Sequence, residues 1–210
     1  MALATRLDEG LAYQQINLDD AQRASLLDFV GLLDKWNKVY NLTAVRDPLQ
    51  MVSRHILDSL TLAPALQNHA VIADLGSGGG LPGIPMAVMY PDKDFTLVDS
   101  NQKKTRFLVH TVTTLGLTNV RVLHERVENV QLEAPADCVT ARAFAAPQAI
   151  LDYADPLCKA AAEVVLMVGK PEQLDLSPAK GFHWQSTVPV QVYNESASRH
   201  IVRFARTARA

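Results

Sequence analysis

The segment ADLGSGGGLPGIP, residues 73–85, combines an apolar run, an aspartate and five glycines, the last of them Gly83. Glycine has no β-carbon, so it adopts positive φ without strain and lets a ligand lie directly against the main chain. A glycine-rich turn without a ligand is the plain alternative. We expect a binding loop, because an acidic residue and bare backbone follow a strand-like run.

Two ligands compete for this loop. Gly78, Gly80 and Gly83 match the G-x-G-x-x-G pattern of dinucleotide-binding loops. Gly76, Gly78 and Gly80 match the G-x-G-x-G pattern of S-adenosyl-L-methionine (SAM) loops, and Asp74 stands two residues ahead. A dinucleotide needs an early helix N-terminus for its pyrophosphate, and the prolines flanking Gly83 argue against a regular helix there. Asp74 also suits a ligand with a cationic amino-acid end, so SAM is favoured and a dinucleotide stays the alternative.

Asp99 is the second candidate ligand-binding residue. It ends a strand-like run about 20 residues beyond the glycines, where an acidic side chain can hold both hydroxyls of a ribose. Either nucleotide ligand satisfies this prediction. Lys103, Lys104 and Arg106 follow closely; they either form a solvated first helical turn or contact nucleic acid.

Alternating strand-like and helix-like segments must position these residues. Residues 20–40 and 48–66 have helical spacing, and the first 67 residues are expected to form a helical cap. Strands are expected at 71–77, 94–100, 119–126, 136–144 and 163–170, and helices at 84–90, 103–115 and 147–160. A hairpin is expected at 184–194 and 199–206.

This alternation predicts an α/β fold with a doubly wound, Rossmann-like parallel sheet. The closing antiparallel hairpin favours the class I SAM-dependent methyltransferase variant over the dehydrogenase variant. We therefore predict two units: an N-terminal helical cap over residues 1–67 and a SAM-dependent methyltransferase domain over 68–210.

The composition limits the location and partners of the chain. Of its 210 residues, 48% are hydrophobic and 20% charged, and the formal net charge is −2. No apolar run is long enough to span a bilayer, and the N-terminus does not resemble a signal peptide. Cys138, Cys158 and the scattered histidines have no metal-type spacing. We expect a cytoplasmic protein with neither metal nor membrane contact.

Seven motifs spread over most of the chain belong together: KWNKVYNLTAVRDP (35–48), RHILDS (54–59), DLGSGGGLPGIP (74–85), DSNQKKTRFL (99–108), RVE (126–128), ARAFA (141–145) and RHIVRF (199–204). They resemble the RsmG (GidB) family, which methylates guanine N7 in 16S ribosomal RNA. The motif WNK…YNLT and the motif GLPGIP are specific to that family rather than to methyltransferases at large.

The glycine loop, Asp99 and the resemblance together give a set of candidate cofactor-binding residues. They are Asp74, Gly76, Ser77, Gly78, Gly80, Leu81, Asp99, Ser100, Val127, Glu128 and Arg142. Arg142 is also the candidate catalytic residue, since the resemblance puts it beside the methyl-transfer pocket. The candidate RNA-binding residues are Phe144, Lys103, Lys104, Lys170, Arg199 and His200.

The chain departs from the family near the fifth strand. The family usually has Leu-Lys-Gly there, whereas here the run is Met167-Val168-Gly169-Lys170. The lysine has moved past the glycine, so whether Lys170 replaces the family's contact is left open.

Guanine N7 as the methyl acceptor is consistent with the absence of an evident general base or cysteine nucleophile in the sequence. Guanine N7 has a lone pair and no proton to remove, so no general base is required. No cysteine is well placed as a nucleophile, and the segment after the fourth strand reads TARAFAAP rather than the N-P-P-Y of amine methyltransferases. Arg142 can contact guanine O6, a phosphate or the SAM carboxylate; its alternative is a surface salt bridge to Asp137 or another acid. Phe144 either stacks on a base or packs in the core.

The charge distribution bears on the partner. Residues 1–34 carry two basic and six acidic side chains, whereas the last fifteen residues carry four arginines and no acid. Because the basic surface is modest, we expect weak binding to naked RNA. The expected substrate is 16S ribosomal RNA within the 30S subunit or an assembly intermediate, modified by a monomer.

Further basic side chains lie in the cap, and Trp36 and Tyr40 alternate with them, as in stacking surfaces, or else pack the cap on the sheet. Two other functions stay open at this point: an NAD(P)-dependent oxidoreductase and a non-enzymatic SAM- or nucleotide-sensing module.

Overall fold

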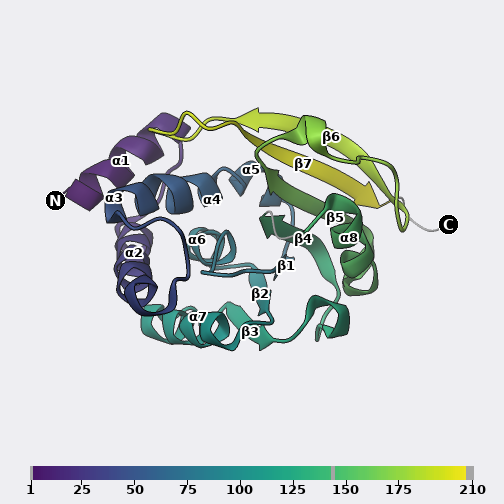
Figure 1. The fold of residues 1–210 in the computed structure, drawn as a ribbon, viewed down its shortest axis with the longest axis horizontal. Helices are drawn as coiled ribbons and strands as arrows, with labels where there is room; N and C mark the ends of the chain where they lie inside the picture. Colours follow the sequence, from purple (N-terminus) through teal and green to yellow (C-terminus); the bar gives the residue numbers. More distant parts are fainter. Residues whose placement is uncertain (1, 143–144, 207–210) are drawn as a thin grey trace.

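A mixed sheet of seven strands forms the centre of the computed structural model, which describes residues 2–142 and 145–206 (Figure 1). The spatial order of the strands is β3-β2-β1-β4-β5-β7-β6. Strands β1 to β5 are parallel, and β7 pairs antiparallel with both β5 and β6. The strands are β1 (Val71–Leu75), β2 (Asp94–Asp99), β3 (Val120–His124), β4 (Ala136–Arg142), β5 (Cys158–Val168), β6 (Phe182–Val190) and β7 (Arg199–Arg206). This arrangement confirms the predicted Rossmann-like sheet with an antiparallel end.

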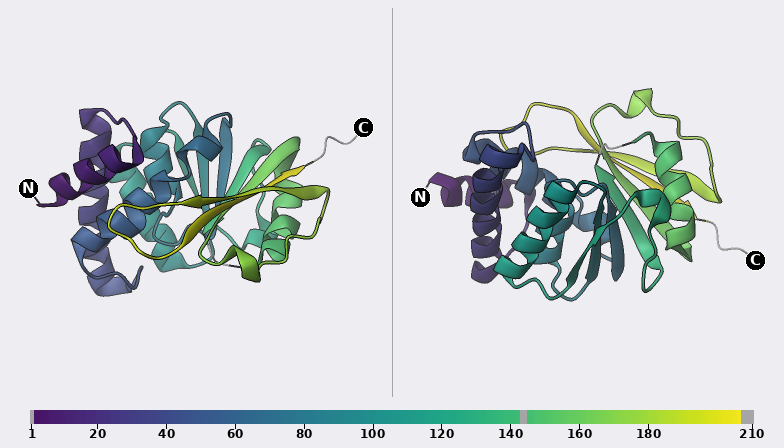
Figure 2. Two further views of the ribbon diagram at one scale, coloured as in Figure 1. Left: turned by 90° about the horizontal axis from the view of Figure 1, so that it is seen from above. Right: turned by 60° about the horizontal axis from the view of Figure 1, so that its bottom comes forward.

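The N-terminal segments form the cap on one side of the sheet (Figure 2). They are α1 (Ala2–Gln14), α2 (Asp20–Tyr40), α3 (Pro48–Met51), η1 (Val52–Leu57), α4 (Asp58–Leu60) and α5 (Ala63–Leu66). The later helices are α6 (Gly83–Met89), α7 (Gln102–Leu115) and α8 (Pro147–Ala154), with short 3₁₀ turns at Val127–Asn129, Asp155–Leu157 and Pro171–Gln173.

Two apolar cores lie on the two faces of the sheet. One core joins the cap, α6 and α7 to side chains such as Phe95 and Leu97. The other packs α8 against Val139 and Leu166, among others. The boundary predicted after residue 67 falls between α5 and β1, yet the first core continues across it.

Helix α2 has the limits that the sequence predicts. The Asp19 side chain accepts a hydrogen bond from the Gln22 amide, and the Gln22 side chain accepts one from the Asp19 amide, which forms a capping box. The helix ends at Asn41, whose left-handed conformation has φ of 51°. Its buried positions, Leu26, Phe29, Val30, Leu33 and Asn37, follow the helical period.

Two predicted helices are wrong in their limits. Residues 48–66 form several short segments rather than one helix, and Val52–Leu57 is π-helical. The helix predicted over 147–160 ends at Ala154, because Pro156 lacks the amide hydrogen that a continuing helix requires. Cys158 is consequently the first residue of β5 rather than part of a helix.

The connection between β6 and β7 reaches the cap. Figure 1 shows this yellow segment running from the sheet to α1. Tyr13 Oη donates to Gln191 Oε1 at 2.7 Å, and Tyr193 Oη donates to Glu9 Oε2 at 3.0 Å. Within residues 2–142 and 145–206, no helix is both long and apolar enough to cross a membrane.

Candidate functional site

A pocket of about 380 Å³ opens at the carboxyl ends of the parallel strands, where ligands of doubly wound sheets bind. The loops after β1, β2, β3 and β4 and the helix α8 all contribute to it. Its lining residues are Gly76, Asp99, Ser100, Lys104, Arg126, Val127, Glu128, Ala145 and Tyr153. The structure thus brings five of the predicted cofactor-binding residues together: Gly76, Asp99, Ser100, Val127 and Glu128.

Backbone geometry explains the glycines of the loop after β1. Gly76, Gly78 and Gly80 have φ of 66°, 57° and 80°, a region that disfavours residues with a β-carbon. The Gly78 amide donates to Asp99 Oδ2 at 2.9 Å. The Ser77 amide donates to the Val98 carbonyl at 2.9 Å, so the loop is tied to the end of β2.

Asp99 is held in place at the pocket wall. Besides the Gly78 amide, its carboxylate accepts the Asn101 amide on Oδ1 at 2.8 Å, and Lys104 Nζ lies 3.8 Å from Oδ2. Each carboxylate oxygen has a second lone pair. The oriented carboxylate can therefore accept hydrogen bonds from ribose hydroxyls without losing its backbone partners.

One argument against a dinucleotide is wrong. Gly83 is the first residue of α6, with Pro82 just before it and Pro85 in the first turn, so the prolines begin the helix instead of disrupting it. A β-carbon on Gly83 would overlap Leu97 Cδ2 and lie 2.8 Å from Asp74 Oδ2. What occupies this helix N-terminus is Asp74, whose Oδ2 accepts the Gly83 amide at 3.1 Å.

Asp74 lies below the glycine loop and is fully buried. Its Oδ1 has no hydrogen-bond partner among the residues that the structure describes. Burial raises the pKa of Asp74 to about 7, although the Ser77 and Gly83 hydrogen bonds oppose this. The side chain is absent from the pocket lining, so it supports the loop from below.

The remaining predicted loop residues shape the turn rather than line the pocket. Ser77 Oγ donates to the Asp74 carbonyl at 2.8 Å. Leu81 is 3% exposed and belongs to the core on the cap side. A β-carbon on Gly80 would lie 2.7 Å from Ile84 Cγ1. The absence of a side chain at Gly80 therefore permits α6 to lie close to the loop.

Arg142 points toward the cap, where it forms an ion pair with Asp58 rather than with Asp137. Its Nη1 lies 3.5 Å from Asp58 Oδ2 and from the Arg54 carbonyl oxygen. Arg199 Nε donates to the other Asp58 oxygen at 3.0 Å. Asp137, the partner considered from the sequence, accepts the Ala70 and Val71 amides.

Asp58 is the clearest residue that the sequence analysis missed. Burial raises its pKa, and the charges of Arg142 and Arg199 oppose that shift. Burial likewise lowers the pKa of Arg142, opposed by Asp58. The motif RHILDS contains Asp58 and was the only sequence signal for it. The partners of Asp58, Arg142 and Arg199, are distant in sequence, so the motif alone did not indicate their contact. Arg126, Ala145 and Tyr153 of the pocket were also missed, and Arg126 begins the motif RVE.

The structure spreads the predicted RNA-binding residues along the same edge. Lys103 is exposed at the start of α7, whereas Lys104 lines the pocket at the carboxyl ends of the strands. Lys170 lines a neighbouring hollow of about 510 Å³ at the ends of β4 and β5. His200 Nδ1 lies 3.4 Å from Ser198 Oγ. Phe144 lies outside the described residues.

Of the two cap aromatics, Trp36 packs against α7, whereas Tyr40 contacts Trp36 and stays exposed. The Trp36 ring contacts the rings of Phe107 and His110, at centroid distances of 5.6 and 5.3 Å. Tyr40 contacts Trp36 at 5.2 Å and is partly exposed. His55 is buried, lies 2.8 Å from Thr43 Oγ1 and has its pKa lowered to about 4 by burial, so it is a neutral structural residue.

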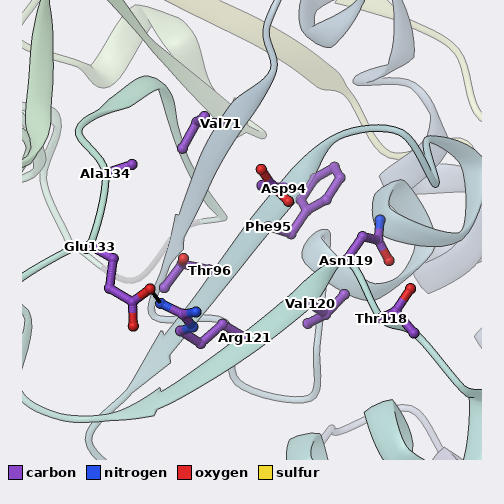
Figure 3. Close-up of a pocket in the computed structure, with 10 residues that line it drawn as sticks. All are labelled: Val71, Asp94, Phe95, Thr96, Thr118, Asn119, Val120, Arg121, Glu133 and Ala134. Atoms are coloured by element: carbon purple, nitrogen blue, oxygen red, sulfur yellow. Dashed lines mark ion pairs between the residues drawn. The ribbon is translucent and has the colours of Figure 1, made fainter.

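A separate pocket of about 240 Å³ lies at the amino ends of the strands (Figure 3). Val71, Asp94 and Val120 line it, and each of them begins a strand. Arg121 and Glu133 form an ion pair at its side, drawn dashed in Figure 3. This pocket is at the edge of the sheet opposite the glycine loop.

Comparison with known proteins identifies close sequence relatives. The family model described as rRNA small subunit methyltransferase G matches residues 22–202. A protein named ribosomal RNA small subunit methyltransferase G from Marinobacter nauticus is 42% identical over 205 residues, covering 97% of this chain and 95% of that protein. The protein of the same name from Serratia proteamaculans is 45% identical over 199 residues, covering 94% of this chain and 96% of that protein. These matches confirm the resemblance seen in the motifs.

Solved structures confirm the fold. A SAM-dependent methyltransferase from Aquifex aeolicus aligns with a TM-score of 0.57 at 16% identity, covering 82% of this chain and 97% of that one. The N-methyltransferase NodS from Bradyrhizobium japonicum, in complex with S-adenosyl-L-homocysteine, aligns with a TM-score of 0.57 at 10% identity, covering 82% and 98%. At such identities the likeness establishes the architecture alone.

Proposed function

The chain belongs to the rRNA small subunit methyltransferase G family, and we propose that it transfers the methyl group of SAM to N7 of a guanine in 16S ribosomal RNA. The observation that carries the proposal is the pocket at the carboxyl edge, where five residues predicted for the cofactor meet. The NAD(P)-dependent oxidoreductase is not favoured, because both the family and the structural relatives are methyltransferases.

The residues of the pocket fit SAM. Asp99 has accepting lone pairs for the ribose, and Gly76 offers backbone without a side chain. Val127 and Glu128 supply an apolar and an acidic side chain at the wall formed by the loop after β3, where the adenine would lie. The bound cofactor supplies an electrophilic methyl group on a sulfonium.

Alignment of the two reactants is the main work of the protein. Guanine N7 already carries the attacking lone pair, so the side chains at the edge need not remove a proton. Arg142, next to the loops after β1 and β4, would bind guanine O6, a phosphate or the cofactor carboxylate and so orient the acceptor. Orientation of this kind can lower a barrier by up to about 7–11 kcal/mol.

The RNA is proposed to be bound within the 30S subunit or an assembly intermediate, by a cytoplasmic monomer. The formal net charge of −2 provides little general attraction to phosphates. Of the basic residues predicted to bind RNA, only Lys103, Lys170 and Arg199 lie at this edge outside the pocket. A folded or protein-bound RNA would add contacts based on shape.

Tritiated methyl transfer tests the proposal directly. We expect incorporation into 30S subunits that lack the modification, and digestion of the RNA should yield N7-methylguanosine. Calorimetric titration should give SAM binding and no NADH binding. SAM binding without transfer to 30S subunits or to free 16S RNA would instead favour a sensing module.

Arg142→Ala tests the assignment of the catalytic residue. We expect transfer to fall by about 10²-fold while the protein stays folded, because a charged donor at the reacting centre is lost. Arg121→Ala removes a cation at the opposite edge and should leave the rate unchanged. A wild-type rate in Arg142→Ala would refute the assignment.

A further inference from the structure

Three segments far apart in the sequence meet at the side chain of Asp58. Asp58 begins α4 in the cap, Arg142 ends β4 and Arg199 begins β7; the arginines are 84 and 141 residues away from the aspartate. The aspartate is 3% exposed, and each of its oxygens faces a different guanidinium. A buried carboxylate therefore joins the cap to two strand ends at the binding edge.

The charges in this cluster do not balance. Two guanidiniums share the Asp58 carboxylate, because Arg54 pairs with Glu195 at 3.1 Å and the buried His55 is neutral. Asp74 also interacts with Arg142, but its pKa of about 7 leaves it only partly ionised at neutral pH. The side chains of Arg142 and Arg199 are 27% and 26% exposed, whereas that of Asp58 is only 5% exposed. The positive charge consequently faces solvent and the negative charge lies behind it.

The two arginines also have unused donors. Arg142 makes hydrogen bonds to the described residues only through Nη1, at 3.5 Å, and Arg199 only through Nε and Nη1. A guanidinium has five N–H groups in a planar fork that matches the oxygens of a phosphate. Two such forks beside each other, with donors to spare, are suited to an anion with several oxygens.

We propose that Asp58 is a positioning residue that holds Arg142 and Arg199 together as a clamp for one phosphate of the RNA, next to the nucleotide to be methylated. Without the carboxylate the two guanidiniums repel each other and separate. The inference rests on the proposed function for its ligand, but it assigns a role to a residue that does not itself touch RNA.

Asp58→Asn tests the proposal, because two explanations predict opposite signs. The substitution removes a negative charge, so a simple count of charges predicts tighter RNA binding. The clamp predicts weaker binding: the KM for 30S subunits should rise about tenfold, the loss expected for a hydrogen bond to a charged group. The slope of log affinity against log salt should become shallower by about 0.7–0.9, which corresponds to one phosphate.

Glu133→Gln is the matched control. Glu133 also pairs with an arginine, Arg121, but lies at the opposite edge of the sheet. The Glu133→Gln substitution removes one negative charge, as Asp58→Asn does, and we expect an unchanged KM for 30S subunits and an unchanged salt slope. The Kd for SAM should stay unchanged in both variants, because the clamp assigns Arg142 to the RNA phosphate rather than to the cofactor carboxylate, and because Asp58 is absent from the pocket lining.

The outcomes separate the two proposals. No methyl transfer by the wild type to 30S subunits overturns the proposed function, and the clamp is then tested by anisotropy with a 16S RNA fragment. A folded Asp58→Asn whose KM and salt slope equal the wild-type values overturns the clamp. If Asp58→Asn loses its circular dichroism spectrum, Arg199→Gln carries the test, and an unchanged salt slope in that variant overturns the clamp.

A double-mutant cycle supplies the last check. If Asp58 acts through the arginines, Asp58→Asn should raise the KM much less in an Arg199→Gln background than in the wild type. Fully additive effects would show that Asp58 acts independently of Arg199 and would contradict the clamp.

Discussion

The charge of a single buried carboxyl group, Asp74, should make the stability of the protein depend on pH. Burial raises its pKa to about 7 in the folded state, from an ordinary value of 3.8. The folded protein therefore holds a proton that the unfolded chain has already lost between about pH 4 and 7. Stability from this group is complete below that window and is lost as the pH rises through it.

Asp74→Asn isolates the effect, because asparagine cannot ionise. We subtract the unfolding free energy of the wild type from that of the variant. We expect this difference to be about 2–3 kcal/mol more positive at pH 8 than at pH 5. Urea unfolding of both proteins at several pH values measures this difference. His55, whose lowered pKa acts with the opposite sign, is present in both and cancels. A difference that does not change with pH would contradict the raised pKa.

Single residues differ in how far the sequence reveals them. Gly76, Asp99, Val127 and Glu128 could be predicted, because local motifs place them on loops that a parallel sheet gathers at one edge. Asp58 could not, since its role depends on two arginines that only the folded chain brings to it. Leu81 illustrates the reverse case: its motif position suggested the pocket, but the structure buries it in the core.

At the level of elements, Gly83 connects the glycine loop to α6. A β-carbon there would overlap Leu97 Cδ2 and press on Asp74 Oδ2, and both neighbours are fully buried. We expect Gly83→Ala to lower the unfolding free energy by about 1–3 kcal/mol, as overpacking does, and to weaken SAM binding because the loop shifts. Urea midpoints and calorimetry measure the two effects.

Gly31 in α2 is the matched control for that substitution. A β-carbon on Gly31 would meet nothing within 4 Å, and the residue lies on the exposed side of the helix. Gly31→Ala should therefore raise stability by about 0.5–1 kcal/mol through helix propensity and leave SAM binding unchanged. Stability changes of the same sign at residues 31 and 83 would contradict the packing argument.

The strands and α2 were predictable because their apolar periods and caps are local. The segments between 48 and 66 were not, because hydrophobic spacing does not separate an α-helix from a π-helical segment. A π turn accommodates one extra residue, which rotates the following side chains around the axis. That segment, Val52–Leu57, ends just before Asp58 and so helps to set the direction of the clamp residue.

For the whole molecule, the connection over residues 191–198 joins the hairpin of β6 and β7 to α1 of the cap. Tyr193 contacts the Tyr13 ring at a centroid distance of 5.7 Å, donates to Glu9 and lies 5.9 Å from the Arg6 guanidinium carbon. Arg199 follows this connection directly. The cap therefore influences the clamp both through Asp58 and through the path of the chain into β7.

Tyr193→Ala should loosen that path. We expect a stability loss of about 1–2 kcal/mol from the ring contact and the hydrogen bond. The KM for 30S subunits should also rise severalfold, since Arg199 is held less firmly, while the Kd for SAM stays constant because other segments line its pocket. Trp184→Ala, on the exposed edge strand β6 and opposite Phe204 rather than Arg199, should change neither constant. Equal KM values in the two variants would mean that the connection does not transmit the position of the cap to the RNA-binding edge.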